Sequence, residues 1–151
     1  MEQITFLMLC GLPASGKSTK AQELAKLYNA TVFSSDALRE ELYNDVNNQE
    51  HNQELFVELH KRIKDCLKSG KSAIYDATNL NCKRRMVFLT ELKGISCEKI
   101  CILMATPYEE CIKRNSERER KVPESVMKRM LTNLCDPQIT EGWDYVHVIY
   151  S

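Results

Sequence analysis

The segment from Gly11 to Ser18 reads G-x-x-x-x-G-K-S, and this pattern constrains the fold more than any other part of the sequence. It follows a nearly continuous apolar run over residues 4–10, which is typical of a strand buried on both faces. It precedes residues 17–28, whose apolar positions recur at helical spacing. A strand, a glycine-rich turn and a helix in this order form a P-loop, whose backbone N–H groups surround a phosphate chain. The sequence therefore predicts an α/β fold that binds a nucleoside triphosphate at this turn.

The residues of the loop divide into backbone and side-chain contacts with the nucleotide. Lys17 is expected to reach the β- and γ-phosphates, where it serves catalysis as well as binding. The Ser18 hydroxyl is expected to coordinate Mg²⁺, so ATP and Mg²⁺ are the predicted cofactors. The expected ATP-binding residues of this segment are Gly11, Leu12, Pro13, Ala14, Ser15, Gly16, Lys17, Ser18 and Thr19.

The rest of the chain alternates between strand-like and helix-like segments. Apolar runs predict further strands over residues 30–33, 72–75, 99–104 and 143–150. Apolar positions at helical spacing predict helices over residues 38–43, 54–68, 83–93, 107–115 and 123–134. Five strands separated by helices favour a parallel sheet within a three-layer α/β fold.

Composition limits the kinds of partner. The chain has 151 residues, enough for one domain with a sizeable core, and its 21 basic side chains balance its 21 acidic ones. This neutrality argues against a protein that coats duplex nucleic acid, but not against one that grips a single strand end. The seven cysteines form no CxxC pair, which favours reduced, mostly buried thiols in a cytoplasmic protein without a zinc site. No apolar run approaches the roughly 18 residues of a membrane span, and no signal peptide is visible, so we expect no membrane partner.

Asp36 is the residue best placed to act on an acceptor. It follows the predicted strand over 30–33, which puts it at the same edge of the sheet as the P-loop. A carboxylate at this edge can accept the proton of a substrate hydroxyl during phosphoryl transfer. Arg39 follows about one helical turn later on the same face, where it can hold a phosphate of the acceptor. The alternative interpretation makes Asp36 a helix cap and Arg39 a surface cation.

A second polar cluster follows the third predicted strand. Asp76 stands where a carboxylate can meet Mg²⁺ or its bound water, and Thr78 and Asn79 follow it in the loop. An aspartate that only stabilises the loop is the alternative. The basic run that ends in Arg85 offers a contact for acceptor phosphates, against the simpler interpretation of a solvated first helical turn.

The stretch over residues 113–120 is the candidate for a mobile lid over the nucleotide. It begins a longer segment, residues 113–129, that carries seven basic and three acidic side chains and could face a polyphosphate, whereas residues 36–58 carry seven acidic and one basic side chain. An arginine from a basic stretch can neutralise charge that develops on the transferring phosphoryl group. Arg114 can stack on adenine, while Arg118 and Arg120 compete for the catalytic position. A solvated helix surface is the alternative for the whole stretch.

Four pieces of the chain occur in an order and approximate spacing that span residues 4–134. They are Gly11–Thr19, Ser35–Arg39, Asp76–Asn81 with Arg84 and Arg85 after it, and Lys113–Arg118 with Val122 and Pro123 beyond. In this combination the chain resembles the 5′-kinase domain of phage and bacterial polynucleotide kinases. The resemblance implies an α/β fold like that of adenylate kinase, with a five-stranded parallel sheet of order 2-3-1-4-5. It also implies one P-loop kinase domain over residues 1–151.

The same resemblance implies transfer of the ATP γ-phosphate to a 5′-hydroxyl end of DNA or RNA. It makes Asp36 the general base and Arg39 a contact for the acceptor's 3′-phosphate. It assigns Arg114 to the nucleotide and Arg118, rather than Arg120, to catalysis within a mobile lid at about residues 114–123. The expected acceptor is therefore a single-stranded nucleic-acid end or a small nucleotide-like molecule. The residues expected to bind substrate are Arg39, Asp76, Thr78, Asn79 and Arg85.

The chain also departs from this family. No Asp-x-Asp-x-Thr phosphatase signature is present, so repair of 3′ ends is not expected. The acidic stretch over residues 36–58 lies on the expected acceptor side, where it disfavours a long strand. Two alternatives therefore stand beside the polynucleotide kinase: a small-molecule P-loop kinase for a nucleoside, a sugar or a similar hydroxyl, and a nucleotide-dependent switch without an acceptor.

Overall fold

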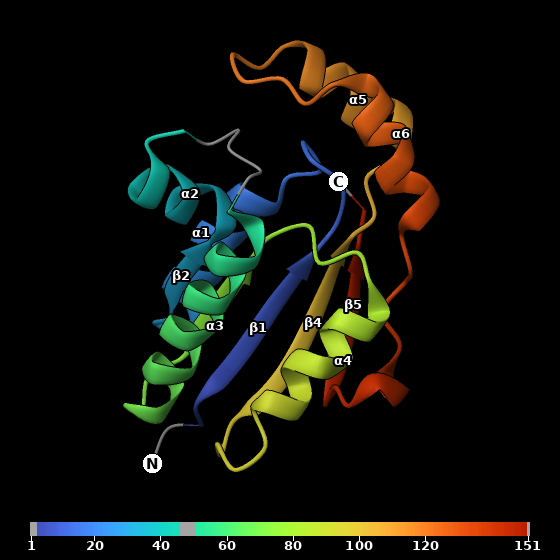
Figure 1. Cartoon of the computed structure of the whole chain (residues 1–151). Helices are drawn as coiled ribbons and strands as arrows, with labels where there is room; N and C mark the ends of the chain where they lie inside the picture. Colours follow the sequence, from blue (N-terminus) through green and yellow to red (C-terminus); the bar gives the residue numbers. More distant parts are fainter. Residues whose placement is uncertain (1–2, 46–50, 151) are drawn as a thin grey trace.

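The computed structural model describes residues 3–45 and 51–150, and its centre is one parallel sheet (Figure 1). The five strands lie in the order β2-β3-β1-β4-β5, which confirms the predicted 2-3-1-4-5 arrangement. Every neighbouring pair of strands is parallel. The strands are β1 (Thr5–Cys10), β2 (Thr31–Ser34), β3 (Ala73–Asp76), β4 (Glu98–Met104) and β5 (Tyr145–Ile149).

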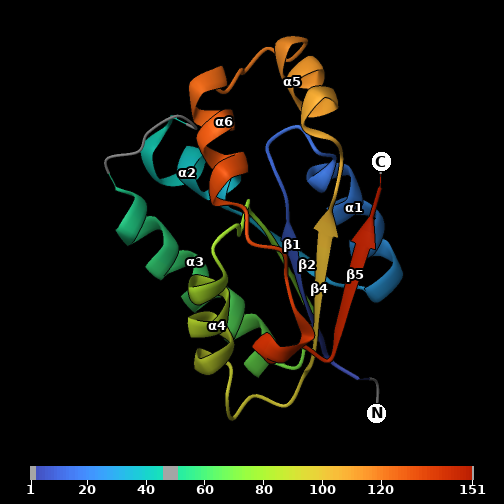
Figure 2. The ribbon, with the colours of Figure 1, turned by 90° about the vertical axis from the view of Figure 1, so that its right-hand side faces the viewer.

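Helices cover both faces of this sheet and give the three layers expected from the sequence. Figure 2 shows α3 and α4 on one side of the strands and α1 on the other. The helical segments are α1 (Lys17–Tyr28), α2 (Ser35–Tyr43), α3 (Asn52–Lys68), α4 (Cys82–Glu91), α5 (Tyr108–Ser116), α6 (Glu124–Asn133) and the short 3-10 turn η1 (Ile139–Glu141). Helices α5 and α6 stand beyond the carboxyl ends of the strands (Figures 1 and 2).

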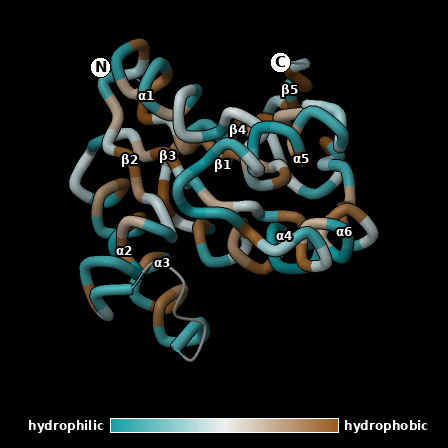
Figure 3. The backbone as a smooth tube through the Cα atoms, turned by 90° about the horizontal axis from the view of Figure 1, so that it is seen from above, coloured by the Kyte–Doolittle hydropathy of each residue, from teal (hydrophilic) through white to brown (hydrophobic). Residues whose placement is uncertain are grey.

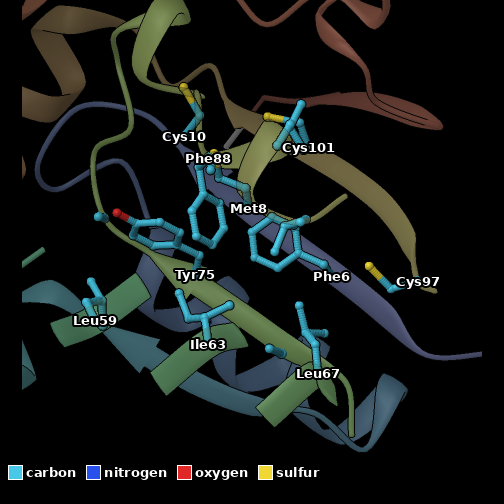
Figure 4. Close-up of a cluster of buried hydrophobic side chains, with 14 of the residues drawn as sticks. Phe6, Met8, Cys10, Leu59, Ile63, Leu67, Tyr75, Phe88, Cys97 and Cys101 are labelled. Atoms are coloured by element: carbon cyan, nitrogen blue, oxygen red, sulfur yellow. The ribbon is translucent and has the colours of Figure 1, made fainter. Parts of the chain in front are cut away.

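Strand β1 is buried along its whole length because it pairs with a neighbour on each side and is covered on both faces. Its side chains alternate between two cores. Leu7 and Leu9 face α1, where they meet Ala21 and Leu24. The alternate residues Phe6, Met8 and Cys10 contribute to the larger core under α3 and α4. In this core Phe6 packs on Phe88 with ring centroids 5.4 Å apart (Figure 4).

The register of the strands brings their carboxyl ends to one edge of the sheet. Asp76 at the end of β3 lies beside Leu9 of β1 on one side and Ser34 of β2 on the other. The chain therefore leaves β1 for the P-loop, β2 for α2 and β3 for its polar loop at the same place. Figure 3 views this end, with α2 and α3 on one side and α5 and α6 on the other.

Several boundaries differ from the predicted ones. The last strand begins at Tyr145 rather than at residue 143, because Trp143 is turned into the core beside Phe6 and is only 4% exposed. The 3-10 turn η1 before it was not predicted, since three residues are too few for a periodic pattern. The helix predicted over residues 54–68 already begins at Asn52, and the connection before it lies partly outside the described residues. Among the described residues, no helix combines the length and the apolarity that crossing a membrane requires.

The start of α2 depends on one side chain. The Ser34 hydroxyl accepts a hydrogen bond from the backbone N–H of Ala37 at 3.2 Å and so caps the helix that carries Asp36. We expect Ser34→Ala to lower the free energy of unfolding by about 1 kcal/mol, the usual value of such a cap, as measured by urea denaturation. Ser34→Thr keeps the hydroxyl and serves as the control. Equal losses in the two variants would contradict the capping role.

Candidate active site

The P-loop turn requires glycine at its first position. A Cβ at Gly11 would lie 3.0 Å from the backbone oxygen of Met104 and 2.9 Å from Ser15 Oγ. Only glycine lets the backbone pass this close to the end of β4. The Gly11 N–H also donates to the carbonyl of Thr78 at 3.0 Å, so the loop after β3 supports the P-loop from the other side.

The amino terminus of α1 is suited to an anion. Gly16 caps the helix in the left-handed conformation, with φ of 98°, and supplies no side-chain cap. The first turn holds no acidic side chain, so its backbone N–H groups and the positive end of the helix dipole point to the loop without a competing carboxylate. This arrangement fits the phosphates of ATP.

Lys17 is folded back onto the loop, where its Nζ donates to the carbonyl of Leu12 at 2.8 Å. Burial lowers the pKa of Lys17, and the neighbouring carboxylates of Asp76 and Asp36 act in the opposite direction. The ammonium group has exchanged part of its hydration for one carbonyl and two nearby negative charges. A phosphate chain in the loop would give it a stronger, charge-assisted partner.

Ser18 and Asp76 form the candidate Mg²⁺ site. Ser18 Oγ lies 3.4 Å from Asp76 Oδ2, so a hydroxyl and a carboxylate face one another across the start of α1 and the end of β3. Burial raises the pKa of Asp76, while Lys17 and the hydrogen bond from Ser18 lower it and Asp36 raises it further. Mg²⁺ prefers one or two protein oxygens together with phosphate oxygens and water, and this donor set fits that preference. No cluster of three or more His, Cys, Asp or Glu side chains suited to a metal occurs within residues 3–45 and 51–150.

Asp36 stands between two arginines. Arg39 donates to its Oδ1 at 3.1 Å from the same helix, and Arg120 donates to its Oδ2 at 2.9 Å from the segment between α5 and α6. Arg39 is only 6% exposed and also contacts Asn52 Oδ1 at 2.9 Å. The sequence placed Asp36 and Arg39 on one face but contained no local signal that Arg120, 84 residues away, would join them.

These residues line one cavity of about 970 Å³. Most of the predicted site lines it. The P-loop contributes Pro13 to Thr19 without Ser15, α2 contributes Asp36 and Arg39, and the end of β3 and its loop contribute Asp76 and Thr78. The segment over 114–123, expected to be a lid, contributes Arg114, Arg118 and Arg120 together with Lys121, Val122 and Pro123, which had no predicted role of their own. Helix α6 adds Val126, Arg129 and Met130.

The lid segment is closed on itself by one asparagine. The amide of Asn115 donates to the carbonyl of Val122 at 2.7 Å and accepts from the Val122 N–H at 3.0 Å. This pair of bonds draws residues 117–121 into a compact loop that presents Arg118 and Arg120 to the cavity. Asn115 was not singled out in the sequence, because an asparagine among charged residues carries no distinctive spacing.

Asn79 and Arg85 do not line the cavity, although the sequence suggested substrate contacts for both. Asn79 has a left-handed backbone with φ of 48°, and its amide nitrogen donates to the Leu9 carbonyl at 2.8 Å. It therefore shapes the loop after β3 rather than facing an acceptor. The asparagine fits this role since it tolerates positive φ better than most residues.

Arg85 is buried, with a side chain only 1% exposed, and forms a two-point ion pair with Glu141 through bonds of 2.9 Å. Its remaining N–H groups donate to the carbonyls of Asn79 and Cys135, each at 2.8 Å. Although burial alone would raise it, the hydrogen bonds from Arg85 and Trp143 hold the pKa of Glu141 below its usual range. The predicted contact with acceptor phosphates is thus corrected: Arg85 joins the loop after β3 to the segment that follows α6.

Comparison with known proteins adds a family to this geometry. A family model described as an AAA domain (AAA_33) matches residues 6–137. The chain belongs to this family. L-seryl-tRNA(Sec) kinase of Methanococcus maripaludis is 27% identical over 143 residues, which cover 91% of this chain and 55% of that protein. Protein kti12 of Schizosaccharomyces pombe is 24% identical over 154 residues, covering 91% and 54%, so the chain spans about half the length of these curated relatives.

Solved structures with the same fold include several P-loop kinases. Kti12 of Chaetomium thermophilum in complex with ADP-AlF3 has a TM-score of 0.77 at 17% identity and covers 96% of this chain and 88% of that chain. A chain of the Pnkp1/Rnl/Hen1 RNA repair complex has a TM-score of 0.74 at 21% identity, with coverage of 89% and 45%. A gluconokinase from Sinorhizobium meliloti has a TM-score of 0.69 at 15% identity, with coverage of 99% and 84%. The protein therefore has the fold of P-loop kinases that act on different substrates.

The Arg85–Glu141 pair gives a prediction about stability. Arg85→Met leaves a buried carboxylate without its cation, so we expect a loss of about 3–5 kcal/mol in the free energy of unfolding, measured with urea. The double variant Arg85→Met/Glu141→Leu removes both charges and should recover part of this loss. If the double variant were as unstable as the sum of the single variants, the two side chains would not be energetically coupled.

A substitution of Asp76, in contrast, should stabilise the nucleotide-free fold. Its pKa is raised in the folded chain, so the stability that protonated Asp76 provides is present below the ordinary pKa of 3.8 and is lost as the pH rises through the folded value. At pH 7 the buried charge is a penalty that Asp76→Asn removes. We expect a higher melting temperature in the absence of nucleotide, and each kcal/mol gained corresponds to about 2–4 °C for a domain of this size.

The same variant should bind Mg²⁺–ATP more weakly, because a neutral amide is a poorer ligand for Mg²⁺ than a carboxylate. Its thermal gain should shrink as the pH is lowered towards 3.8. Asp65→Asn, at an exposed position on α3, is the matched control and should leave the melting temperature nearly unchanged. A lower melting temperature for Asp76→Asn at pH 7 would show that the carboxylate stabilises the nucleotide-free fold.

Proposed function

We propose that the protein is an ATP-dependent kinase that transfers the γ-phosphate to a 5′-hydroxyl end of DNA or RNA. The observation that carries this proposal is the charge of the cavity beside the P-loop. Seven basic and two acidic side chains line it, an excess of five positive charges. Arg114 also pairs with Glu110 at 3.2 Å, which reduces this excess by one.

Mg²⁺–ATP carries about two negative charges, so it does not balance the cavity alone. The remaining cations lie on α2 and in the segments around α6, on the side of Asp36 where an acceptor would approach. An acceptor that brings phosphate groups of its own would complete the balance, whereas a neutral sugar would not. A nucleic-acid end provides both the hydroxyl and the phosphates.

The residues of the cavity have distinct roles in the proposed reaction. Lys17 and the backbone N–H groups of the P-loop hold the β- and γ-phosphates, with Ser18 and Asp76 holding Mg²⁺, which neutralises charge on the phosphate oxygens. Asp36 accepts the proton of the acceptor hydroxyl while the oxygen of that hydroxyl forms a bond to the γ-phosphorus. The bond between that phosphorus and the bridging oxygen of ADP breaks at the same centre, and ADP keeps the electron pair.

Residues 114–123 act as a mobile lid in this proposal. Arg114 contacts the nucleotide, and Arg118 neutralises charge on the transferring phosphoryl group. Both line the cavity, and no hydrogen bond or ion pair of the Arg118 side chain is present within the described residues. The lid is anchored by an apolar cluster in which Leu12 of the P-loop meets Cys111 of α5 and Met127 of α6.

Two similar proteins whose names include RNA support the choice of acceptor. One relative is named as a kinase of L-seryl-tRNA(Sec), and one structure of the same fold belongs to an RNA repair complex. Both names place a P-loop kinase fold beside RNA. We infer the same class of acceptor here, with a short contact, because exposed acidic residues on α2 and at the start of α3 flank the cavity.

The principal alternative is a small-molecule kinase, and those flanking acidic residues favour it. Glu40, Glu41 and Glu54 are exposed on α2, which carries Asp36, and at the start of α3, and Glu41 is paired with Arg62 at 2.7 Å. The net negative charge of this region would repel a long strand. The gluconokinase among the structures of the same fold shows that the architecture also serves sugars. A nucleotide-dependent switch is a third possibility, in which ATP is bound or hydrolysed without an acceptor.

One panel of acceptors distinguishes these functions. The protein is incubated with Mg²⁺ and γ-labelled ATP and with 5′-hydroxyl oligonucleotides, nucleoside 3′-phosphates, free nucleosides, gluconate or other sugars. We expect label on the oligonucleotides and the nucleoside 3′-phosphates. Label only on nucleosides or sugars would replace this function with the small-molecule one, and release of phosphate without any labelled acceptor would favour the switch.

Asp36 should be needed for transfer but not for ATP binding. We expect Asp36→Ala to lower the turnover number about 10²–10⁴-fold, the usual contribution of a general base. ATP affinity, measured by isothermal titration calorimetry, should change little because the P-loop contacts remain. Glu40→Ala, one turn later on an exposed position of α2, is the control and should keep near-normal turnover. Near-normal turnover in Asp36→Ala would exclude it as the base.

A further inference from the structure

Both oxygens of the proposed general base are covered by cations. Arg39 binds Oδ1 of Asp36 at 3.1 Å and Arg120 binds Oδ2 at 2.9 Å. An acceptor hydroxyl needs one of these oxygens within hydrogen-bonding distance before its proton can be transferred. Each oxygen keeps a second lone-pair site, and the Asp36 side chain is 47% exposed, so a hydroxyl can approach. The two guanidinium groups nevertheless compete with it for the same oxygens and the same space.

Arg120 is the arginine that can move. Arg39 is held by α2, is 6% exposed and has a second bond to Asn52. Arg120 lies in the loop between α5 and α6, and its side chain is 30% exposed. Asp36 is the only hydrogen-bond or ion-pair partner of this side chain among the described residues. The ion pair with a partly exposed carboxylate is weak enough to exchange for another anion.

Both arginines also have an unused donor. The Nε atoms of Arg39 and Arg120 are buried and have no hydrogen-bond partner among the described residues. An unsatisfied buried donor costs free energy, and one on each side of the same carboxylate prepares the site for a second anion. A phosphate group has enough oxygens to bind both guanidinium groups at once.

We propose that Arg120 determines specificity: it competes with the acceptor hydroxyl for the Asp36 carboxylate until a phosphate on the acceptor draws its guanidinium away. An acceptor with such a phosphate removes this competition as it binds. A neutral acceptor of the same shape has to compete with the Arg120–Asp36 pair throughout. This inference rests on the proposed kinase function and assigns Arg120 a task different from that of Arg118.

The test compares one acceptor with and without its phosphate. Transfer from ATP to a nucleoside 3′-phosphate and to the corresponding nucleoside is measured as kcat/KM for the wild type and for Arg120→Ala. Removal of Arg120 should raise the rate with the nucleoside about twofold to fivefold, the range expected from loss of a partly exposed ion pair. It should lower the rate with the 3′-phosphate at least about tenfold, because charge-assisted bonds to the phosphate are lost.

Arg118→Ala is the matched control. It lies in the same loop, and its removal should lower the rates with both acceptors by the same factor. Arg120→Lys keeps a cation at the position and should stay closer to the wild type than Arg120→Ala. Equal losses with both acceptors in Arg120→Ala would overturn the inference and make Arg120 a second cation for the transferring phosphate.

A binding measurement separates the failure of this inference from the failure of the kinase function. Affinity for the nucleoside 3′-phosphate is measured by titration calorimetry without ATP, and Arg120→Ala should weaken it at least about tenfold. Transfer by the wild type with unchanged affinity in the variant would overturn the role of Arg120 alone. Absence of transfer to every acceptor by the wild type would overturn the proposed function itself.

Discussion

The position of β1 at the centre of the sheet is the constraint on which the whole site depends. Its backbone is hydrogen-bonded to β3 on one side and β4 on the other, so the end of the strand cannot shift without disturbing both. The P-loop leaves from that end, and Gly11 fits because no side chain separates it from Met104. Three paired strands therefore fix the position of the P-loop, which can shift only if the sheet shifts with it.

Charge in the cavity is organised at a cost to the nucleotide-free fold. Asp76 is buried close to Asp36, and burial shifts its pKa towards the neutral form. Burial lowers the pKa of Lys17, which also favours the neutral form, and its Nζ donates to a carbonyl in place of a phosphate. We expect Mg²⁺ and ATP to satisfy these groups better than their present partners do. Such strain is common where a site is prepared for a ligand that neutralises it.

Two long-range contacts tie the parts of the site together. Arg85 joins the loop after β3 to Cys135 and Glu141 beyond α6, so the segment that follows α6 and the loop that supports the P-loop share one buried side chain. Arg120 joins the segment between α5 and α6 to Asp36 on α2. In the proposed reaction, these two contacts are the links between the P-loop side and the acceptor side of the cavity.

The strands, the P-loop and the faces of most helices could be predicted from the chain alone, because they depend on local periodicity and on turn residues, whereas the order of the strands was implied by the family resemblance. The apolar run before Gly11 and the stripe of α3 are examples in which each residue's neighbours in sequence are also its neighbours in space. The partners of the Arg85 and Arg120 side chains could not be predicted in this way. Their partners lie 56 and 84 residues away, and nothing in a basic run distinguishes a buried arginine from a solvated one. Only the packing of α4 against η1, and of the lid against α2, decided which cation became structural and which one reached the cavity.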